Sequence, residues 1–151
     1  MQKSPENGRY GTNQYRSYKR IRRNGLGEFK IIPYTRGKAI RYYCLECVSF
    51  SSDEVKKCTM LECQLFPYRF GKRPKDKTSR DRAKAIRSHC LECVCGDLEW
   101  IRECPSDLCP VHPYRLSGYQ TDKTSLIPGE RIENLPVDDR QFEETEQKIA
   151  V

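Results

Sequence analysis

Apolar residues occur in short bursts along the 151-residue chain, separated by polar and charged stretches. Hydrophobic residues make up 36% of the sequence and charged residues 32%, which argues against one large core. No apolar run approaches the roughly 20 residues of a membrane-spanning helix. We therefore expect one or two small domains built from short elements, without a membrane segment.

The basic N-terminal region, residues 1–37, has an apolar pattern that fits two different elements. Tyr15, Tyr18 and Ile21 recur at a spacing of three, which indicates a short helix ending near Asn24. Asn-Gly between two β-rich runs instead indicates a hairpin. The strand-like segment FKIIPY favours the hairpin.

Short helices are expected at four places. The segment KAIR leads into each of two Cys-x-x-Cys pairs, and Ser79 is a candidate N-cap before the second. Two further helices are expected after Ser51 or Ser52 and after Asp97, where acidic residues suit the start of the helix dipole.

Extended chain is expected elsewhere. Pro67 and Pro113 disfavour helix in the recurring Pro-Tyr-Arg segments. Residues 119–151 have little periodicity, so they are expected to form an acidic, largely irregular tail, with a short helix around residues 139–149.

The chain repeats itself with a shift of 46 residues. Residues 38–69 and 84–115 align without a gap, and 14 of the 32 aligned positions are identical. Each copy reads Cys-x-x-Cys, ten residues, Cys, four residues, Cys. Such a repeat indicates two copies of one structural unit, at 38–71 and 84–118, joined by a basic linker at 72–83.

Four shared cysteines per unit match the ligand count of a closed tetrahedral zinc site. Cys95, His89 and His112 have no cysteine or histidine counterpart in the first copy and fall outside the shared set. The sequence therefore predicts two zinc ions, one per repeat. The predicted ligands are Cys44, Cys47, Cys58 and Cys63 in the first unit and Cys90, Cys93, Cys104 and Cys109 in the second.

Other uses of the cysteines fit less well. A disulfide framework needs an oxidising compartment, but the chain has nine cysteines and its first residues, MQKSPENGRYG, lack the apolar core of a secretory signal. A cytoplasmic location is therefore expected. A redox Cys-x-x-Cys needs a thioredoxin-like context, which is missing. An iron–sulfur cluster remains an alternative, because Cys104 and Cys109 are each followed by proline.

The size of each unit explains why a metal is expected. Each has about 35 residues, below the ~40 at which a core alone usually suffices, whereas structural zinc supplies on the order of 10 kcal/mol. The predicted fold is a small metal-stabilised α+β structure. Its expected core consists of Ala39, Ile40, Leu45, Val48, Val55, Leu65 and Tyr68, with Ala85, Ile86, Leu91, Val94, Ile101, Val111 and Tyr114 in the second unit.

Charge is unevenly distributed. Residues 1–43 carry eleven Lys and Arg against two acids, a net +9, whereas residues 119–151 carry a net −4. Basic residues interleaved with tyrosines can follow a phosphate backbone and stack on bases, so nucleic acid, above all duplex DNA, is the expected partner. A solvated basic face is the alternative. The predicted contacts are Arg16, Lys19, Arg20, Arg22, Arg23, Arg69, Lys72, Arg73, Lys75 and Arg115.

Three residues have alternative predicted roles. Arg69 and Arg115 end the Pro-Tyr-Arg segments and could read a guanine edge or pair with Glu46 and Glu92. Trp100, the single tryptophan, is expected to pack between the units, or else to anchor a partner protein.

The shared pattern AIRxxCLEC…C…C…PYR resembles short cysteine-rich segments of small phage and prophage proteins, over about half the chain. The resemblance implies a mobile-element context and no particular activity.

No paired carboxylates, phosphate-cradling loop or open metal position points to catalysis, so we expect a non-enzymatic protein. The alternative to nucleic-acid binding is an adaptor that docks on a host transcription or defence complex.

Overall fold

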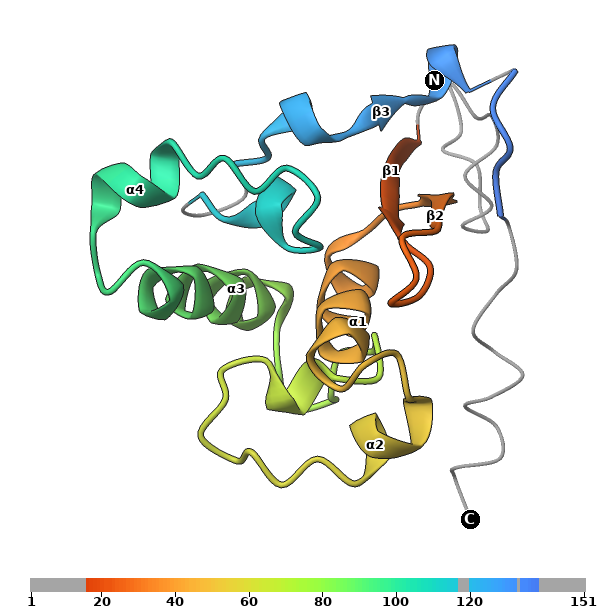
Figure 1. Cartoon of the computed structure of the whole chain (residues 1–151). Helices are drawn as coiled ribbons and strands as arrows, with labels where there is room; N and C mark the ends of the chain where they lie inside the picture. Colours follow the sequence, from red (N-terminus) through yellow and green to blue (C-terminus); the bar gives the residue numbers. More distant parts are fainter. Residues whose placement is uncertain (1–15, 117–119, 133, 139–151) are drawn as a thin grey trace, which may run out of the picture.

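The computed structural model describes residues 16–116, 120–132 and 134–138. These residues form a small mixed α+β structure with a three-stranded antiparallel sheet beside a set of short helices (Figure 1). The sheet has the order β2-β1-β3, with β1 at Ser17–Arg22, β2 at Phe29–Pro33 and β3 at Ile127–Pro128.

Within the N-terminal region, residues 17–33 form the predicted hairpin and not a helix. Arg20 of β1 lies opposite Ile31 of β2, and the pairing extends to Arg22 and Phe29. The loop is longer than a two-residue Asn-Gly turn, because the Arg23 N–H donates to the Glu28 carbonyl at 2.8 Å and Gly27 adopts a φ of 82°. That φ is easily reached only by glycine.

The tail contributes to the sheet, contrary to the expectation of a largely irregular segment. β3 pairs with the start of β1, with Tyr18 opposite Ile127. Val137 bridges the outer edge of β2, where the Asp138 N–H donates to the Ile31 carbonyl at 2.8 Å. A two-residue strand is too short to show periodicity in a sequence. The helix expected around residues 139–149 lies outside the described residues.

The two long helices include the Cys-x-x-Cys pairs in their last turns. α1 spans Arg36–Cys47 and α3 spans Ser79–Cys93. The N-cap of α3 is Thr78, one residue before the predicted Ser79: its hydroxyl accepts from the Asp81 N–H at 3.1 Å, and Asp81 accepts in return from the Thr78 N–H at 2.8 Å. This capping box satisfies two N–H groups at once and fixes the helix start.

The same backbone path follows both helices. The Phe50 N–H donates to the Leu45 carbonyl at 2.6 Å, and at the equivalent place the Gly96 N–H donates to the Leu91 carbonyl at 2.7 Å. The residues before them, Ser49 and Cys95, have left-handed φ values of 56° and 54°.

The predicted second helices follow immediately. α2 spans Ser52–Lys56 with Ser51 as N-cap, and α4 spans Leu98–Arg102 with Asp97 as N-cap. α2 and α4 lie on opposite sides of the α1–α3 pair (Figure 1).

The sequence predicted that the Pro-Tyr-Arg segments are extended, and this prediction is wrong. They form single 3-10 turns, η2 at Phe66–Tyr68 and η3 at His112–Tyr114, with proline in the first turn. Proline is tolerated there because the first N–H groups of a helix have no intrahelical acceptor.

One hydrophobic cluster joins the hairpin, both repeats and the tail. It includes Ile21, Ile40, Leu65, Ile86 and Leu126. Ten of the predicted core residues are buried, five from each repeat, whereas Leu45, Val48, Leu91 and Val94 are half-buried.

The repeats contact each other at equivalent positions. The rings of Tyr43 and His89, which occupy the same place in the two copies, meet edge to face with their centroids 4.4 Å apart. This contact joins α1 of the first repeat to α3 of the second.

Two further elements complete the described tail: η4 at Lys123–Ser125 and η5 at Gly129–Arg131.

Candidate metal centres and a basic surface

The four shared cysteines of each repeat lie in two places: the last turn of a long helix and the loop after the short helix that follows it. In the first repeat, Cys44 and Cys47 lie on the last turn of α1, and Cys58 and Cys63 follow α2. Cys58 donates its N–H to Val55 at 3.3 Å and Cys63 donates to Met60 at 3.0 Å.

The second repeat has matching bonds. Cys104 donates its N–H to Ile101 at 3.3 Å, and Cys109 donates to Ser106 at 2.9 Å. Both cysteine sets are therefore presented by the same local geometry.

The thiols of each set lie near enough for their charges to interact. Burial, followed by the charges of Cys63, Cys47 and Cys58, raises the pKa of the Cys44 thiol to about 12. In the second repeat, burial and then Cys109, Cys93 and Cys104 raise the pKa of Cys90 to about 12. The cysteine neighbours of each thiol come from its own repeat. Crowded thiolates repel one another, so such a set favours a cation that offsets their charge.

The thiols do not form a finished metal site. Within the described residues, no three His, Cys, Asp or Glu side chains are arranged closely enough to hold an ion. All nine cysteines are free, with Cys47 and Cys93 exposed and the other six predicted ligands half-buried. Four thiolates are a donor set that suits zinc, but the sulfur atoms would have to move together to bind it. The zinc sites therefore stay a prediction.

Cys95 and His112 lie outside the shared cysteine set. Cys95 is exposed at the left-handed position after α3, as Ser49 is after α1. The two ring nitrogens of His112 lie 2.9 Å from the Ser125 hydroxyl and 2.9 Å from the Cys104 carbonyl. Burial lowers the pKa of His112. Because a carbonyl only accepts, Nε2 carries a proton and donates to Cys104.

Five of the ten predicted nucleic-acid contacts lie in the hairpin or next to it. Arg20, Arg22 and Arg23 are exposed, and Arg16 is half-buried. The Arg20 guanidinium lies 4.1 Å from the centre of the Phe29 ring. Arg22 forms a 3.4 Å ion pair with Glu46, which ties the hairpin to α1.

Lys19 is buried and does not lie on the predicted contact surface. Its side chain is 1% exposed, and its ammonium group donates to the Asp107 carbonyl in the second repeat. Burial lowers the pKa of Lys19. Because side chains alternate along a strand, Lys19 shares the inner face of β1 with Ile21, a placement that the hairpin pattern could have indicated.

Arg115 also lies outside the predicted contact surface, because all three nitrogen atoms of its guanidinium group donate hydrogen bonds within the fold. Nε donates to Ile101 at 2.6 Å, Nη2 to Arg102 at 2.8 Å, and Nη1 to the Asp122 carboxylate at 2.7 Å. The predicted partner Glu92 is not used. The actual partner comes from the tail, which no repeat comparison could reveal.

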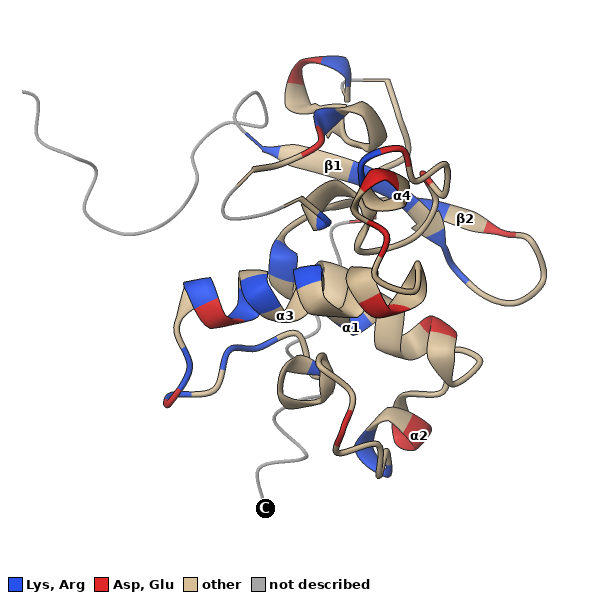
Figure 2. Ribbon diagram, turned by 90° about the vertical axis from the view of Figure 1, so that its left-hand side faces the viewer, with Lys and Arg blue, Asp and Glu red and all other residues tan. Residues whose placement is uncertain are grey.

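Its counterpart Arg69 is half-buried. It donates to the Phe66 carbonyl at 3.1 Å and lies over the rings of Phe66 and Phe70, with centroid distances of 4.0 and 4.4 Å. The linker contacts Lys72, Arg73 and Lys75 are exposed. Figure 2 shows Lys and Arg gathered on this linker and on the first half of α3.

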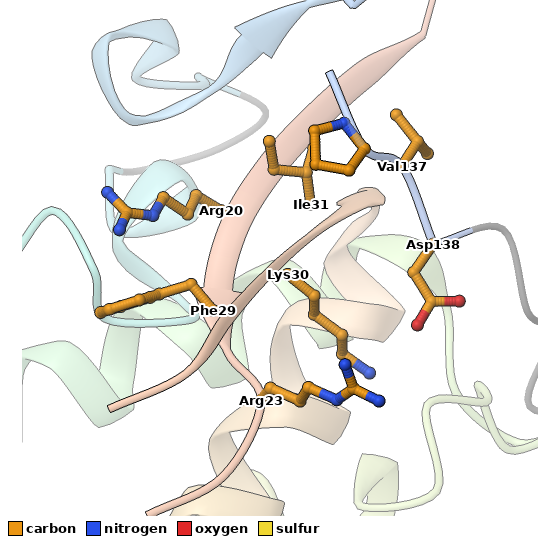
Figure 3. A pocket seen from close by; sticks show the side chains of 8 residues that line it. Arg20, Arg23, Phe29, Lys30, Ile31, Val137 and Asp138 are labelled. Carbon is orange, nitrogen blue, oxygen red and sulfur yellow. The ribbon is translucent and has the colours of Figure 1, made fainter. Parts of the chain in front are cut away.

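Beside the hairpin lies an open hollow of about 740 Å³ that sequence reasoning missed (Figure 3). Arg23 and Lys30 point toward one end of it, Arg20 lies over Phe29, and Asp138 stands on another wall. Ile31, Pro136 and Val137 supply apolar lining. The sequence predicted a strand at Phe29 and Lys30 but no binding role for them. Nothing in the sequence pattern of the tail indicated that its residues would line a hollow.

The sequence matches no family model, and neither a curated protein nor a solved structure is significantly similar to it. Across the described part of the chain, none of the helices has the length and apolar character needed to cross a bilayer. The function must therefore be argued from the cysteine sets and the basic surface.

Proposed function

We propose that the chain is a non-enzymatic, zinc-binding, nucleic-acid-binding protein that contacts duplex DNA through its hairpin. The observation that carries this proposal is the hollow beside the hairpin, which is lined by Arg20, Arg23, Lys30 and Phe29 and by apolar residues. Cations suit phosphates, and an aromatic ring suits a base or a sugar, so the surface offers both parts of a nucleic-acid contact.

The shape of the hairpin supports a duplex partner. A two-stranded ribbon can enter the major groove of B-DNA, which is about 12 Å wide. β3 pairs with the first two residues of β1, and Val137 bridges Ile31 of β2, whereas the loop end carries Leu26 at 85% exposure and is left to project.

Zinc has a structural role in this proposal. Bound by the four cysteines of each repeat, it would hold the helix end and the loop after α2 or α4 together. A binding role is favoured over a catalytic one because Lys19, His112 and Arg115, three buried ionisable groups, are occupied by hydrogen bonds within the fold. The cytoplasmic location and the phage context stay part of the proposal.

The test is binding of a fluorescent duplex over a range of salt concentrations. If Arg20, Arg22, Arg23 and Lys30 contact phosphates, log affinity falls against log salt with a slope of about −3 to −4. The double change Arg20→Ala and Arg23→Ala reduces that slope by about two. Lys56→Ala, which removes a cation paired with Asp53 on α2, is the control and leaves the slope unchanged. Wild-type protein without salt-sensitive binding would overturn the proposal.

An adaptor role is the second candidate, supported by α4. Trp100 is 68% exposed and Leu98 53% exposed, so the expectation that Trp100 packs between the units is wrong. Exposed tryptophan is typical of anchors in protein interfaces. This candidate predicts that a host complex co-purifies with the wild type and with the Arg20/Arg23 variant, but not with Trp100→Ala.

A further inference from the structure

The loop between the last two cysteines of the second repeat, residues 104–109, is held by the N-terminal hairpin. The Lys19 ammonium group, from β1, donates to the Asp107 carbonyl inside this loop. The hydroxyl of Tyr34, the residue that follows β2, donates to the Pro110 carbonyl directly after the loop. Both donors are buried, with 1% and 5% of their surface exposed, so these bonds form where a low dielectric strengthens them.

A third buried donor holds the start of the same loop. Nε2 of His112 donates at 2.9 Å to the carbonyl of Cys104, one of the four predicted zinc ligands. His112 is 4% exposed, and its other ring nitrogen lies 2.9 Å from the Ser125 hydroxyl in the tail. Side chains from outside the loop thus fix the backbone that carries Cys104 and Cys109.

The first repeat differs at the position of the histidine. Phe66 stands where the second repeat has His112, and its ring has no N–H group to offer to the Cys58 carbonyl. The Phe66 ring instead packs on Arg69, whose guanidinium lies 4.0 Å from the ring centre. The hydrogen bond that fixes a ligand backbone in the second repeat therefore cannot form from this position in the first.

The first repeat also differs at the positions that the hairpin holds in the second. Leu61 and Gln64 occupy the places of Asp107 and Pro110, and both are exposed, Leu61 at 76%. Because the hairpin donors bond to the second loop, the loop at residues 58–63 is left open to solvent at these positions.

We propose that Lys19, Tyr34 and His112 are positioning residues for the second metal centre, so that the second repeat retains zinc after the first has lost it. In both repeats the side chains must still bring the sulfur atoms together, but in the second they do so from a fixed backbone. A fixed backbone loses less conformational entropy when its ligands close on an ion. The inference rests on the proposed zinc binding and adds an order of release to it: the first centre is the one that responds to a falling zinc supply.

The experiment removes zinc from the full-length, zinc-loaded protein with EDTA and follows the metal count by native mass spectrometry. Iodoacetamide added at each time point alkylates the released thiols, and peptide mapping locates them. A one-zinc species accumulates, and its alkylated ligands are those of the first repeat: Cys44, Cys47, Cys58 and Cys63. Cys95 reacts from the start, because it is exposed and lies outside the ligand set.

A matched pair of variants separates a hydrogen-bonding role from a packing role. His112→Phe gives the second repeat the residue of the first and speeds zinc loss from the second repeat about tenfold, as expected when a contact behind a ligand is removed. His112→Gln keeps an N–H donor and releases zinc at nearly the wild-type rate. Lys19→Met removes the donor to Asp107 and speeds loss from the second repeat independently of position 112. The first repeat is the internal control, because its release rate stays unchanged in all three variants.

The possible results separate this inference from the proposed function. Simultaneous loss of both ions, or loss from the second repeat first, overturns the inference and leaves zinc binding intact. Equal release rates in His112→Phe and His112→Gln overturn the role of the donor. Protein that carries no zinc when purified from zinc-containing medium overturns both proposals. Arg20→Ala with Arg23→Ala leaves the order of release unchanged, so a failure of nucleic-acid binding is seen separately.

Discussion

At the scale of single residues, Arg115 connects three parts of the molecule. It bonds the end of α4, the turn of η3 and Asp122 in the tail. Burying a guanidinium group is costly unless its N–H donors are hydrogen-bonded. Arg115 can therefore be buried only because these acceptors are present. Arg115 thus has a packing role, although its counterpart Arg69 stays half-buried on the surface.

Asp122→Asn tests this network. The Thr124 hydroxyl and N–H, together with Arg115, hold the pKa of the Asp122 carboxyl well below its usual range. A lowered pKa in the folded state stabilises the protein above the unfolded pKa of about 3.9, and this contribution is lost as the pH falls below that value.

We therefore expect Asp122→Asn to lower the free energy of unfolding by about 1–3 kcal/mol at pH 7. Urea unfolding at a series of pH values should show the gap between the two proteins narrowing below about pH 4. A gap of the same size at pH 7 and pH 3 would mean that the ionised carboxylate does not stabilise the fold.

Single residues also show what a sequence can reveal. The inward position of Lys19 follows from its two-residue spacing to Ile21 once a strand is assumed. The Arg115–Asp122 pair does not, because it joins residues from a repeat and from an aperiodic tail.

At the scale of elements, local signals were sufficient for most of the helices. Ser51 and Asp97 begin α2 and α4 as expected, because both side chains accept N–H groups of the following turn. The prolines of η2 and η3 were interpreted too strictly, since a first-turn proline permits a short helix. β3 needed tertiary pairing with β1 to form at all.

The cysteines provide a prediction at this scale. Cys95→Ser should leave metal content and folding unchanged, because the equivalent element of the first repeat already has Ser49 there. Cys93→Ser should remove one metal ion, because it takes one of four donors from the last turn of α3. Metal analysis and circular dichroism of both variants measure this. Loss of metal from Cys95→Ser would show that the shared set was assigned incorrectly.

At the scale of the whole molecule, the repeats share one core. Ile40 and Ile86, at equivalent positions, are both fully buried in the same cluster, and Tyr34 stacks on Tyr114 with ring centroids 6.1 Å apart. The hairpin is attached to the second repeat through Lys19 and to the first through Arg22. The two cysteine sets and the basic surface are thus parts of one structure, and zinc bound by the cysteines would stabilise the hairpin face as well.

The most direct test of this account is native mass spectrometry of the full-length protein as purified from zinc-containing medium. The account predicts two zinc ions per chain, one for each set of four cysteines, with Zn–S distances of about 2.3 Å if the same sample is examined by X-ray absorption. A chain that carries one zinc ion, no metal or iron would contradict it.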